Sequence, residues 1–167
     1  MKFLSSKQVN QAIQRAASYN EKSFIIIQLL AKTGVRVKEL ISIFIKDILF
    51  DEKQIIIRGK GNKIRNIDVS DDILMHLKLY IKNNKLKQND LLINLTQQRV
   101  GQITHQLADI NPHGFRHTYA INLLRTTGNN IEYVRRQLGH STLATTQIYL
   151  RYAIYENEKQ KLGEMYS

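Results

Sequence analysis

Three short β-branched segments interrupt an otherwise helical pattern, and they most strongly limit what this chain can fold into. They read "IFIKDILF" (43–50), "QIIIRG" (54–59) and "KIRNIDV" (63–69), with the polar turns "DEK" and "GKGN" between them. Short β-branched runs that are bounded by turn residues are typical of strands joined as hairpins. We therefore predict a three-stranded antiparallel meander within residues 43–69.

Helical patterns lie on both sides of this meander. Ser5 and Gln8 form a capping-box pattern before the first apolar stripe. Gly34 ends the helix that runs through "SFIIIQLLAK", and "VRVKELISI" predicts a short helix after it. Further helices are expected after the caps Ser70 and Thr96, from Pro112 to Gly128, over residues 131–139 and around Tyr149. The expected fold class is α+β, mainly α-helical with a small three-stranded antiparallel sheet, in a single domain over residues 1–167.

Charge is the most informative bulk property. Lys and Arg number 25 against 14 Asp and Glu, a formal net charge of +11, which favours a polyanionic partner such as nucleic acid. A surface that serves only solubility could carry the same charge, so the sequence motifs are needed to distinguish the two explanations. The chain has no cysteine, which excludes disulfides and thiolate metal sites. No apolar run is long enough for a membrane span, and the N-terminus turns polar too early for a signal peptide; we expect a cytoplasmic protein.

Several short segments carry side chains that suit phosphate chemistry, although each has a simpler explanation. In "PHGFRH" (112–117), His113 and Arg116 share one helix face near an N-terminus, where anions are stabilised. A capping histidine and a surface arginine would look the same. The turn "RGKGNKIR" (58–65) could reach into a DNA groove, or could simply be a basic hairpin. In "LGHSTLATTQIYL" (138–150), Tyr149 follows His140 by nine residues and could be a buried aromatic or a nucleophile.

Taken in order, these segments resemble the catalytic domain of the tyrosine recombinase (phage integrase, Xer-like) family. The ordered set is "TGVRVKEL", "GKGNK", "PHGFRH", "LGH" and "TTQIY", and the resemblance runs from about residue 20 to 152. It implies six catalytic residues: Arg36, Lys60, His113, Arg116, His140 and Tyr149. The basic residues beside the turn, Arg58, Lys63 and Arg65, are expected to contact DNA. His117 is expected to be structural, and Glu39 to support the Arg36 region without taking part in the chemistry.

Elementary chemistry is consistent with those roles. An arginine offers a planar fork of donors that matches two phosphate oxygens, so Arg36 and Arg116 could together replace a metal clamp. A tyrosine hydroxyl, with a pKa of about 10, needs a positive or basic environment before it attacks. A lysine on a turn, Lys60, could protonate the departing 5′-oxygen. The acidic residues are scattered and no phosphate-binding GxxxxGK[ST] loop is present, so we expect no metal and no cofactor.

The expected function is site-specific DNA cleavage and rejoining through a covalent 3′-phosphotyrosyl intermediate, as in integration, excision or resolution. Two alternatives remain open: a non-cleaving DNA-binding accessory protein and a topoisomerase-IB-like nicking-closing enzyme. The expected partners are double-stranded DNA and further copies of this chain, as a tetramer on DNA through residues 150–167. The N-terminal core-binding domain that is typical of the family is expected to be absent, which predicts weak and poorly selective DNA binding.

Overall fold

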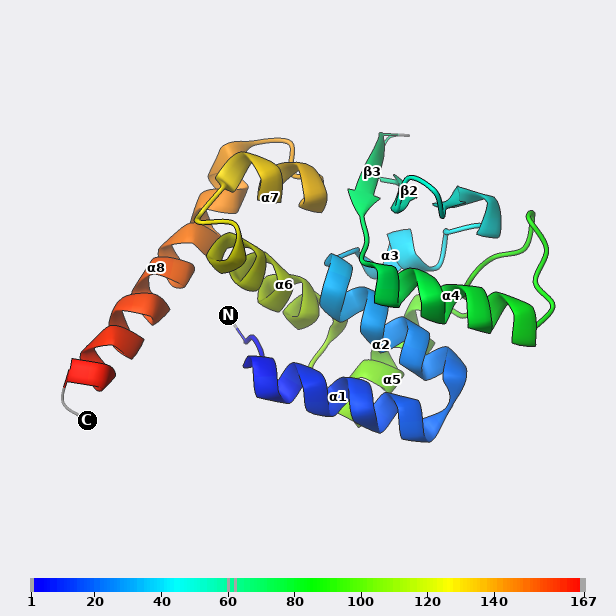
Figure 1. Ribbon diagram of the computed structural model, residues 1–167, viewed down its shortest axis with the longest axis horizontal. Coiled ribbons are helices and arrows are strands. Elements are labelled where there is room, and N and C mark those ends of the chain that lie inside the picture. The colour runs from blue at the N-terminus through cyan, green and yellow to red at the C-terminus, as the bar shows by residue number, and fades with distance from the viewer. Residues whose placement is uncertain (1, 60, 62, 166–167) are drawn as a thin grey trace.

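Helices dominate the computed structural model, which describes residues 2–59, 61 and 63–165 (Figure 1). The helices are α1 (Ser6–Tyr19), α2 (Glu21–Thr33), α3 (Val37–Leu40), the 3₁₀ turn η1 (Ile45–Asp47), α4 (Asp71–Asn83), α5 (Gln97–Ala108), α6 (Pro112–Thr126), α7 (Ile131–Leu138) and α8 (Leu143–Met165). The strands are β1 (Ile48–Leu49), β2 (Gln54–Arg58) and β3 (Ile64–Asp68). The predicted fold class is confirmed.

The sheet is the predicted antiparallel meander, with the strand order β1–β2–β3. Ile55 pairs with Ile67, and Ile57 pairs with Arg65 one pleat further along. Because side chains alternate between the two faces of a strand, Ile55, Ile57 and Ile67 all point to the same side and are fully buried. The inner face of the paired strands β2 and β3 is therefore formed by buried isoleucine side chains.

The first strand was predicted to span residues 43–50 and is much shorter. Residues Ile45–Asp47 form η1, and only Ile48 and Leu49 pair with β2. The cause is Asp47, whose buried carboxylate accepts a hydrogen bond from the Phe44 N–H (2.9 Å) and pairs with Arg58. Such a local side-chain bond to the backbone offers the chain an alternative to strand pairing.

The predicted helix boundaries hold at most ends. Ser5 and Gln8 form the expected capping box, and Thr96 accepts the N–H of Arg99 at 3.2 Å. Gly34 ends α2 with φ +64°, a conformation that favours glycine. Ser70 occupies the N-cap of α4 without making the expected capping bond, because its hydroxyl bonds to the Asp72 carboxylate instead.

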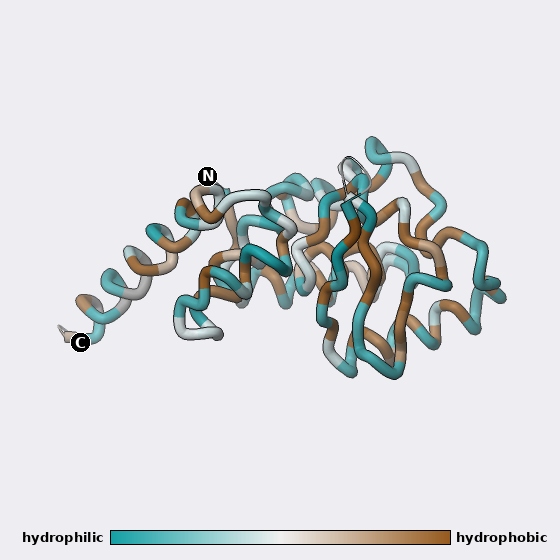
Figure 2. Tube along the Cα trace, turned by 90° about the horizontal axis from the view of Figure 1, so that it is seen from above, coloured by the Kyte–Doolittle hydropathy of each residue, from teal (hydrophilic) through white to brown (hydrophobic). Residues whose placement is uncertain are grey.

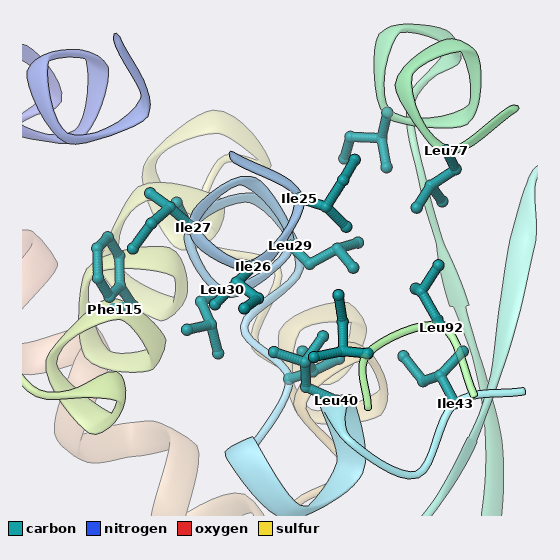
Figure 3. Packing of buried hydrophobic residues seen from close by; sticks show 14 of the residues in the cluster. Ile25, Ile26, Ile27, Leu29, Leu30, Leu40, Ile43, Leu77, Leu92 and Phe115 are labelled. Atoms are coloured by element: carbon teal, nitrogen blue, oxygen red, sulfur yellow. The ribbon is translucent and has the colours of Figure 1, made fainter. Parts of the chain in front are cut away.

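Two groups of buried apolar residues hold the structure together. The larger, the main core, joins α1–α5, the sheet and Phe115 at the start of α6. Helix α2 lies at its centre and packs against α1, α4, α5 and α6; Figure 3 shows its isoleucine and leucine side chains directed to several sides. The smaller group, the C-terminal cluster, consists of Ala120, Ile121, Leu124, Val134, Leu138, Tyr149 and Ala153.

Helix α8 begins in the C-terminal cluster and then projects away from the rest of the molecule (Figures 1 and 2). Hydrophobic and hydrophilic residues alternate along the projecting part in Figure 2. Ile154, Tyr155, Leu162 and Met165 are exposed there. Within the described ranges, no helix is both long and apolar enough to cross a membrane.

Candidate active site

Arg36 occupies the turn between α2 and α3, immediately after the helix-ending Gly34. Its backbone N–H donates to Glu39 Oε2 at 2.8 Å, and its guanidinium donates to Glu39 Oε1 at 3.1 Å. The Arg36 side chain remains 42 % exposed. The turn therefore presents a positive charge to solvent, while Glu39 fixes its direction, as the sequence predicted for Glu39.

Glu39 is buried and also binds Arg65 through both carboxylate oxygens, at 2.7 and 3.0 Å. Burial alone would raise the pKa of Glu39, but the bonds and charges of Arg65 and Arg36 outweigh it and hold that pKa below its usual value. Arg65 Nε also donates to the Gln137 carbonyl at 3.1 Å. One carboxylate thus joins the Arg36 turn to the sheet, and Arg65 joins the sheet to the end of α7.

Arg65 was predicted to contact DNA, and the structure gives it a different environment. Its side chain is only 15 % exposed, and its donors are directed to Glu39 and Gln137 within the protein. A Cβ at Gly139 would lie 2.8 Å from the Arg65 guanidinium, and Gly139 has φ +67°. Arg65 therefore packs tightly beneath the "LGH" turn, and this arrangement favours a role in supporting that turn over a direct phosphate contact.

Arg116 lies one turn into α6 and is almost completely buried, with 2 % exposure. Its guanidinium donates to the Gly34 carbonyl and to the Leu138 carbonyl, each at 2.6 Å. Burial and the neighbouring Arg36 lower its pKa to about 10, so it still carries a charge at neutral pH. A guanidinium has five N–H donors, so these two bonds leave others for a phosphate while holding two turns in place.

His140 and Tyr149 lie side by side, and the charge of Arg116 acts on both. Their rings are nearly parallel, at an interplanar angle of 12° and a centroid distance of 5.9 Å. His140 Nδ1 is 2.9 Å from Thr146 Oγ1. Burial and the surrounding arginines, Arg116 first among them, lower the pKa of His140 to about 4, so its imidazole is neutral at neutral pH. Tyr149 is 6 % exposed, so it is a buried aromatic residue, and its contacts with His140 and His117 leave the predicted role as nucleophile open.

Two histidines of α6 follow one another on the same helix face. His113 is exposed at the first turn, and the His117 ring lies 5.1 Å from it, edge to face. His117 Nδ1 is 2.9 Å from the Tyr149 hydroxyl. Sequence reasoning assigned His117 a structural role and missed this contact. The four-residue spacing from His113 was the available signal, because it places both rings on one face.

A surface pocket brings three of the predicted site residues together. Its lining residues are Val35, Arg36, Val37, Lys38, Gln97, Gly101, Asn111, Pro112, His113 and Arg116. Arg36, His113 and Arg116 thus meet in one opening between α3, α5 and the start of α6. His140 and Tyr149 are not among the lining residues. The charge of Arg116 acts on both, and Tyr149 contacts His117, which follows Arg116 on α6.

The basic hairpin is less completely placed. Lys60, the predicted general acid, lies outside the described residues. Arg58, whose side chain is 41 % exposed, pairs with the buried Asp47, and the exposed Lys63 immediately precedes β3. In the part of the chain that the structure describes, no group of three or more His, Asp or Glu side chains could hold a metal ion.

Comparison with known proteins places this site in context. The family model described as "Phage integrase family" matches residues 2–155. The tyrosine recombinase XerC of Corynebacterium glutamicum is 34 % identical over 89 % of this chain and 54 % of its own length. A crystal structure of XerA recombinase superposes with a TM-score of 0.84 at 29 % identity, covering 96 % of this chain and 65 % of that one. XerH recombinase, solved in a post-cleavage complex with its palindromic difH substrate, has the same fold, with a TM-score of 0.79 at 23 % identity over 96 % and 52 % of the two chains. This chain therefore spans about half to two thirds of the length of the proteins it matches.

Proposed function

Because the chain belongs to the phage integrase family of tyrosine recombinases, we propose that it cleaves and rejoins DNA strands site-specifically through a covalent 3′-phosphotyrosyl intermediate. The single observation that carries this proposal is a cluster of side chains from the turn after α2, from α6, from the turn after α7 and from α8. In it, Arg36, His113 and Arg116 share one pocket, Tyr149 lies against His140 and His117, and the charges of Arg116 and Arg36 act on both Tyr149 and His140. Because the chain spans only part of the length of the proteins it matches, the proposal concerns the cleavage and rejoining of DNA strands before the choice of target site.

The scissile phosphate binds in this pocket. Arg36 reaches it from the exposed side and Arg116 from beneath, and their planar forks neutralise the charge that develops on the non-bridging oxygens. His113, exposed at the start of α6, donates to a phosphate oxygen. His140 is held by Thr146 and is neutral, so it can donate one N–H toward the same group.

Tyr149 is the nucleophile. Its oxygen attacks phosphorus, the bond from phosphorus to the 5′-oxygen breaks, and Lys60 supplies the proton that the leaving oxygen needs. The bond energy stays in the phosphotyrosyl link, so the reverse attack by a 5′-hydroxyl rejoins the strand without a nucleotide cofactor. Neither step needs a metal, because the two arginines provide the charge that a metal would supply.

Double-stranded DNA is the proposed partner, together with further copies of this chain. The relative XerH is described as bound to its difH substrate, and the net charge of +11 suits a polyanion. The projecting part of α8 exposes Ile154, Tyr155, Leu162 and Met165, and a lone helix that exposes such side chains is suited to packing on a neighbouring protomer. We therefore assign residues 150–167 to assembly, with a tetramer on DNA as the working form.

The test is covalent capture on a nicked suicide substrate. A pool of duplexes with random sequence carries a nick just downstream of each possible cleavage position, so that the short 5′-hydroxyl fragment diffuses away after cleavage. With the scissile strand labelled at its 5′ end, a denaturing gel should show labelled protein, with and without EDTA. DNA binding without any adduct would instead favour the accessory-protein alternative, and dependence on a metal would contradict the two-arginine mechanism.

A further inference from the structure

The Tyr149 hydroxyl has a specific partner in this structure. His117 Nδ1 lies 2.9 Å from it, and the two ring centroids are 5.5 Å apart with a tilt of 43°. Within the described residues, no other hydrogen bond to this hydroxyl is found. The contact joins α6 to α8 across a buried position, so the nucleophilic oxygen is held by a residue that sequence reasoning assigned to structure.

The other two histidines of the site are placed differently. The His140 ring lies parallel to Tyr149 and makes no hydrogen bond with its hydroxyl, since its Nδ1 faces Thr146. His113 contacts the His117 ring and lines the phosphate pocket. Only His117 therefore combines a ring nitrogen with direct access to the tyrosine proton.

The protonation state of His117 suits an acceptor. Burial, followed by the neighbouring His113 and Arg116, lowers the pKa of His117 below its ordinary value. Its imidazole is then neutral at neutral pH, and the unprotonated Nδ1 accepts the hydrogen bond that the Tyr149 O–H donates. Burial raises the pKa of Tyr149, although Arg116 and Arg36 oppose that rise. The phenol therefore keeps its proton at rest and needs a base when it attacks.

We propose that His117 is the base that removes the Tyr149 proton during strand cleavage, an inference that rests on the proposed function. The proton moves from the tyrosine oxygen to His117 Nδ1 as that oxygen bonds to phosphorus. The bond from phosphorus to the 5′-oxygen breaks, and the departing oxygen takes a separate proton from Lys60. On rejoining, the imidazolium returns its proton to the tyrosine oxygen as phosphorus leaves it. Atoms and charge balance in both directions without a further reactant.

Two variants separate a base from a residue that only positions the tyrosine. His117→Ala removes both the hydrogen bond and the proton acceptor. His117→Asn keeps an oxygen close to the place of Nδ1, so it can still hold the Tyr149 hydroxyl, but it cannot take up a proton near neutral pH. General base catalysis contributes about 10²–10⁴ in rate. Both variants should therefore cleave in single turnover roughly 10²–10⁴ times more slowly than the unmodified protein, with DNA affinity unchanged. His105→Ala, which changes an exposed histidine on α5, should leave the rate unaffected.

A second substrate separates action on the nucleophile from action on the leaving group. When sulfur replaces the bridging 5′-oxygen, the leaving thiolate needs no protonation. Lys60→Ala should then regain cleavage, whereas His117→Asn should stay slow. Near-normal cleavage by His117→Asn, or recovery of either His117 variant on the sulfur substrate, would overturn the inference. If the unmodified protein forms no adduct on either substrate, the proposed function itself fails; this outcome is distinct from normal cleavage by the variants.

Thermal unfolding of both variants controls for folding. His117 is only partly buried, so His117→Asn should unfold at a temperature close to that of the unmodified protein. A slow variant with unchanged unfolding supports the inference. A slow variant whose unfolding temperature is lowered, and whose rate recovers fully on cooling, would show that His117 acts through stability and would contradict it.

Discussion

The main core and the C-terminal cluster are held together by different means. In the main core, α2 packs its buried isoleucine and leucine side chains against α1, α3, α4, α5 and α6 (Figure 3). In the C-terminal cluster the apolar residues are fewer, and polar side chains are also buried on α6, α7, α8 and the turn before α8, namely Arg116, Gln137, His140 and Thr146. The main core is stabilised by non-directional burial, whereas the cluster depends on particular hydrogen bonds made by the residues of the proposed chemistry.

Helix α6 connects the two regions, and one side chain makes the connection specific. Phe115 belongs to the main core, while Ala120, Ile121 and Leu124 belong to the C-terminal cluster. Between them, Arg116 bonds to the Gly34 carbonyl on one side and the Leu138 carbonyl on the other. The proposed phosphate clamp is therefore also a structural bridge between the main core and the C-terminal cluster.

Removing one oxygen from the C-terminal cluster should have the largest effect on function and nearly none on structure. Tyr149→Phe keeps the buried ring and loses the hydroxyl, so covalent adducts should disappear while DNA binding persists. The free energy of unfolding should change by only about 1 kcal/mol, the usual net contribution of one hydrogen bond. The measurement is the denaturing-gel assay beside a binding assay, with Tyr155→Phe, which changes an exposed tyrosine, as the matched control. Adducts that persist in Tyr149→Phe would assign the nucleophile to another tyrosine.

The bridge between the two regions should be the next most sensitive point. Arg116→Lys keeps the charge but not the fork, so it cannot bond both carbonyls and a phosphate together. We expect cleavage to slow by about 10²–10³, the usual cost of one preorganised donor set. Loss of a charged hydrogen bond should also lower stability by roughly 1.5–3 kcal/mol. Single-turnover cleavage and urea unfolding measure the two effects, and a lysine variant that retains both would refute the bridge.

The difference in packing predicts a difference in cooperativity. Leu30→Ala in the main core should cost roughly 2–5 kcal/mol of unfolding free energy and weaken amide protection throughout the chain. Val134→Ala in the C-terminal cluster should cost less, about 0.8 kcal/mol for each methylene-sized group lost, and weaken protection mainly in α6–α8. Hydrogen exchange measures both, with Leu79→Ala, at an exposed position on α4, as a control. If Val134→Ala weakens amide protection equally throughout the chain, the main core and the C-terminal cluster unfold together.

Acid should loosen the C-terminal cluster before the main core. The folded pKa of His140 is about 4, below the value of about 6.5 in an unfolded chain. Between these values the unfolded state binds more protons, so stability is complete above about pH 6.5 and falls as the pH drops toward 4. The loss should be on the order of 3 kcal/mol at most. Urea unfolding at pH 7 and pH 5 measures it, and His140→Asn should flatten the dependence. An equal slope in that variant would assign the effect to other groups.

The sequence predicted the parts of this molecule that depend on local patterns. Periodicity and caps located α1, α2, α5 and the meander, because apolar spacing and capping residues act within a few positions of each other. The order of motifs identified the family and proposed which residues form the site. The length of the first strand was predicted wrongly, because the strand-like composition of residues 43–50 does not show that the Asp47 carboxylate binds the Phe44 N–H and Arg58 instead.

The partners of the site residues could not be predicted in the same way. The bond from Arg116 to Gly34 joins α6 to a turn 82 positions earlier in the chain, and the bond from Arg65 to Glu39 crosses from the sheet to α3. Neither of these two bonds can be predicted from the spacing of neighbouring residues in the sequence. His117 is the intermediate case, since its spacing from His113 was visible while its contact with Tyr149 depends on how α8 packs.

The smallest expected effect concerns the surface of the main-core region, at the base of the basic hairpin. Lys63, which immediately precedes β3, is exposed, whereas Arg65 on β3 is directed to Glu39 and Gln137. If Lys63 contacts one phosphate, Lys63→Ala should reduce the slope of log K against log salt by about 0.9, because each neutralised phosphate contributes that amount. Phosphate contacts carry little sequence information, so binding to a target and to a scrambled duplex should weaken equally. Arg65→Ala is the informative counterpart: it should leave the slope nearly unchanged and lower stability instead, since it removes the support beneath the "LGH" turn. A salt titration of both variants, read beside urea unfolding, measures the contrast. A slope that falls for Arg65→Ala and not for Lys63→Ala would mean that Arg65 turns outward on DNA, and that the hairpin, rather than Glu39, sets its position in the complex.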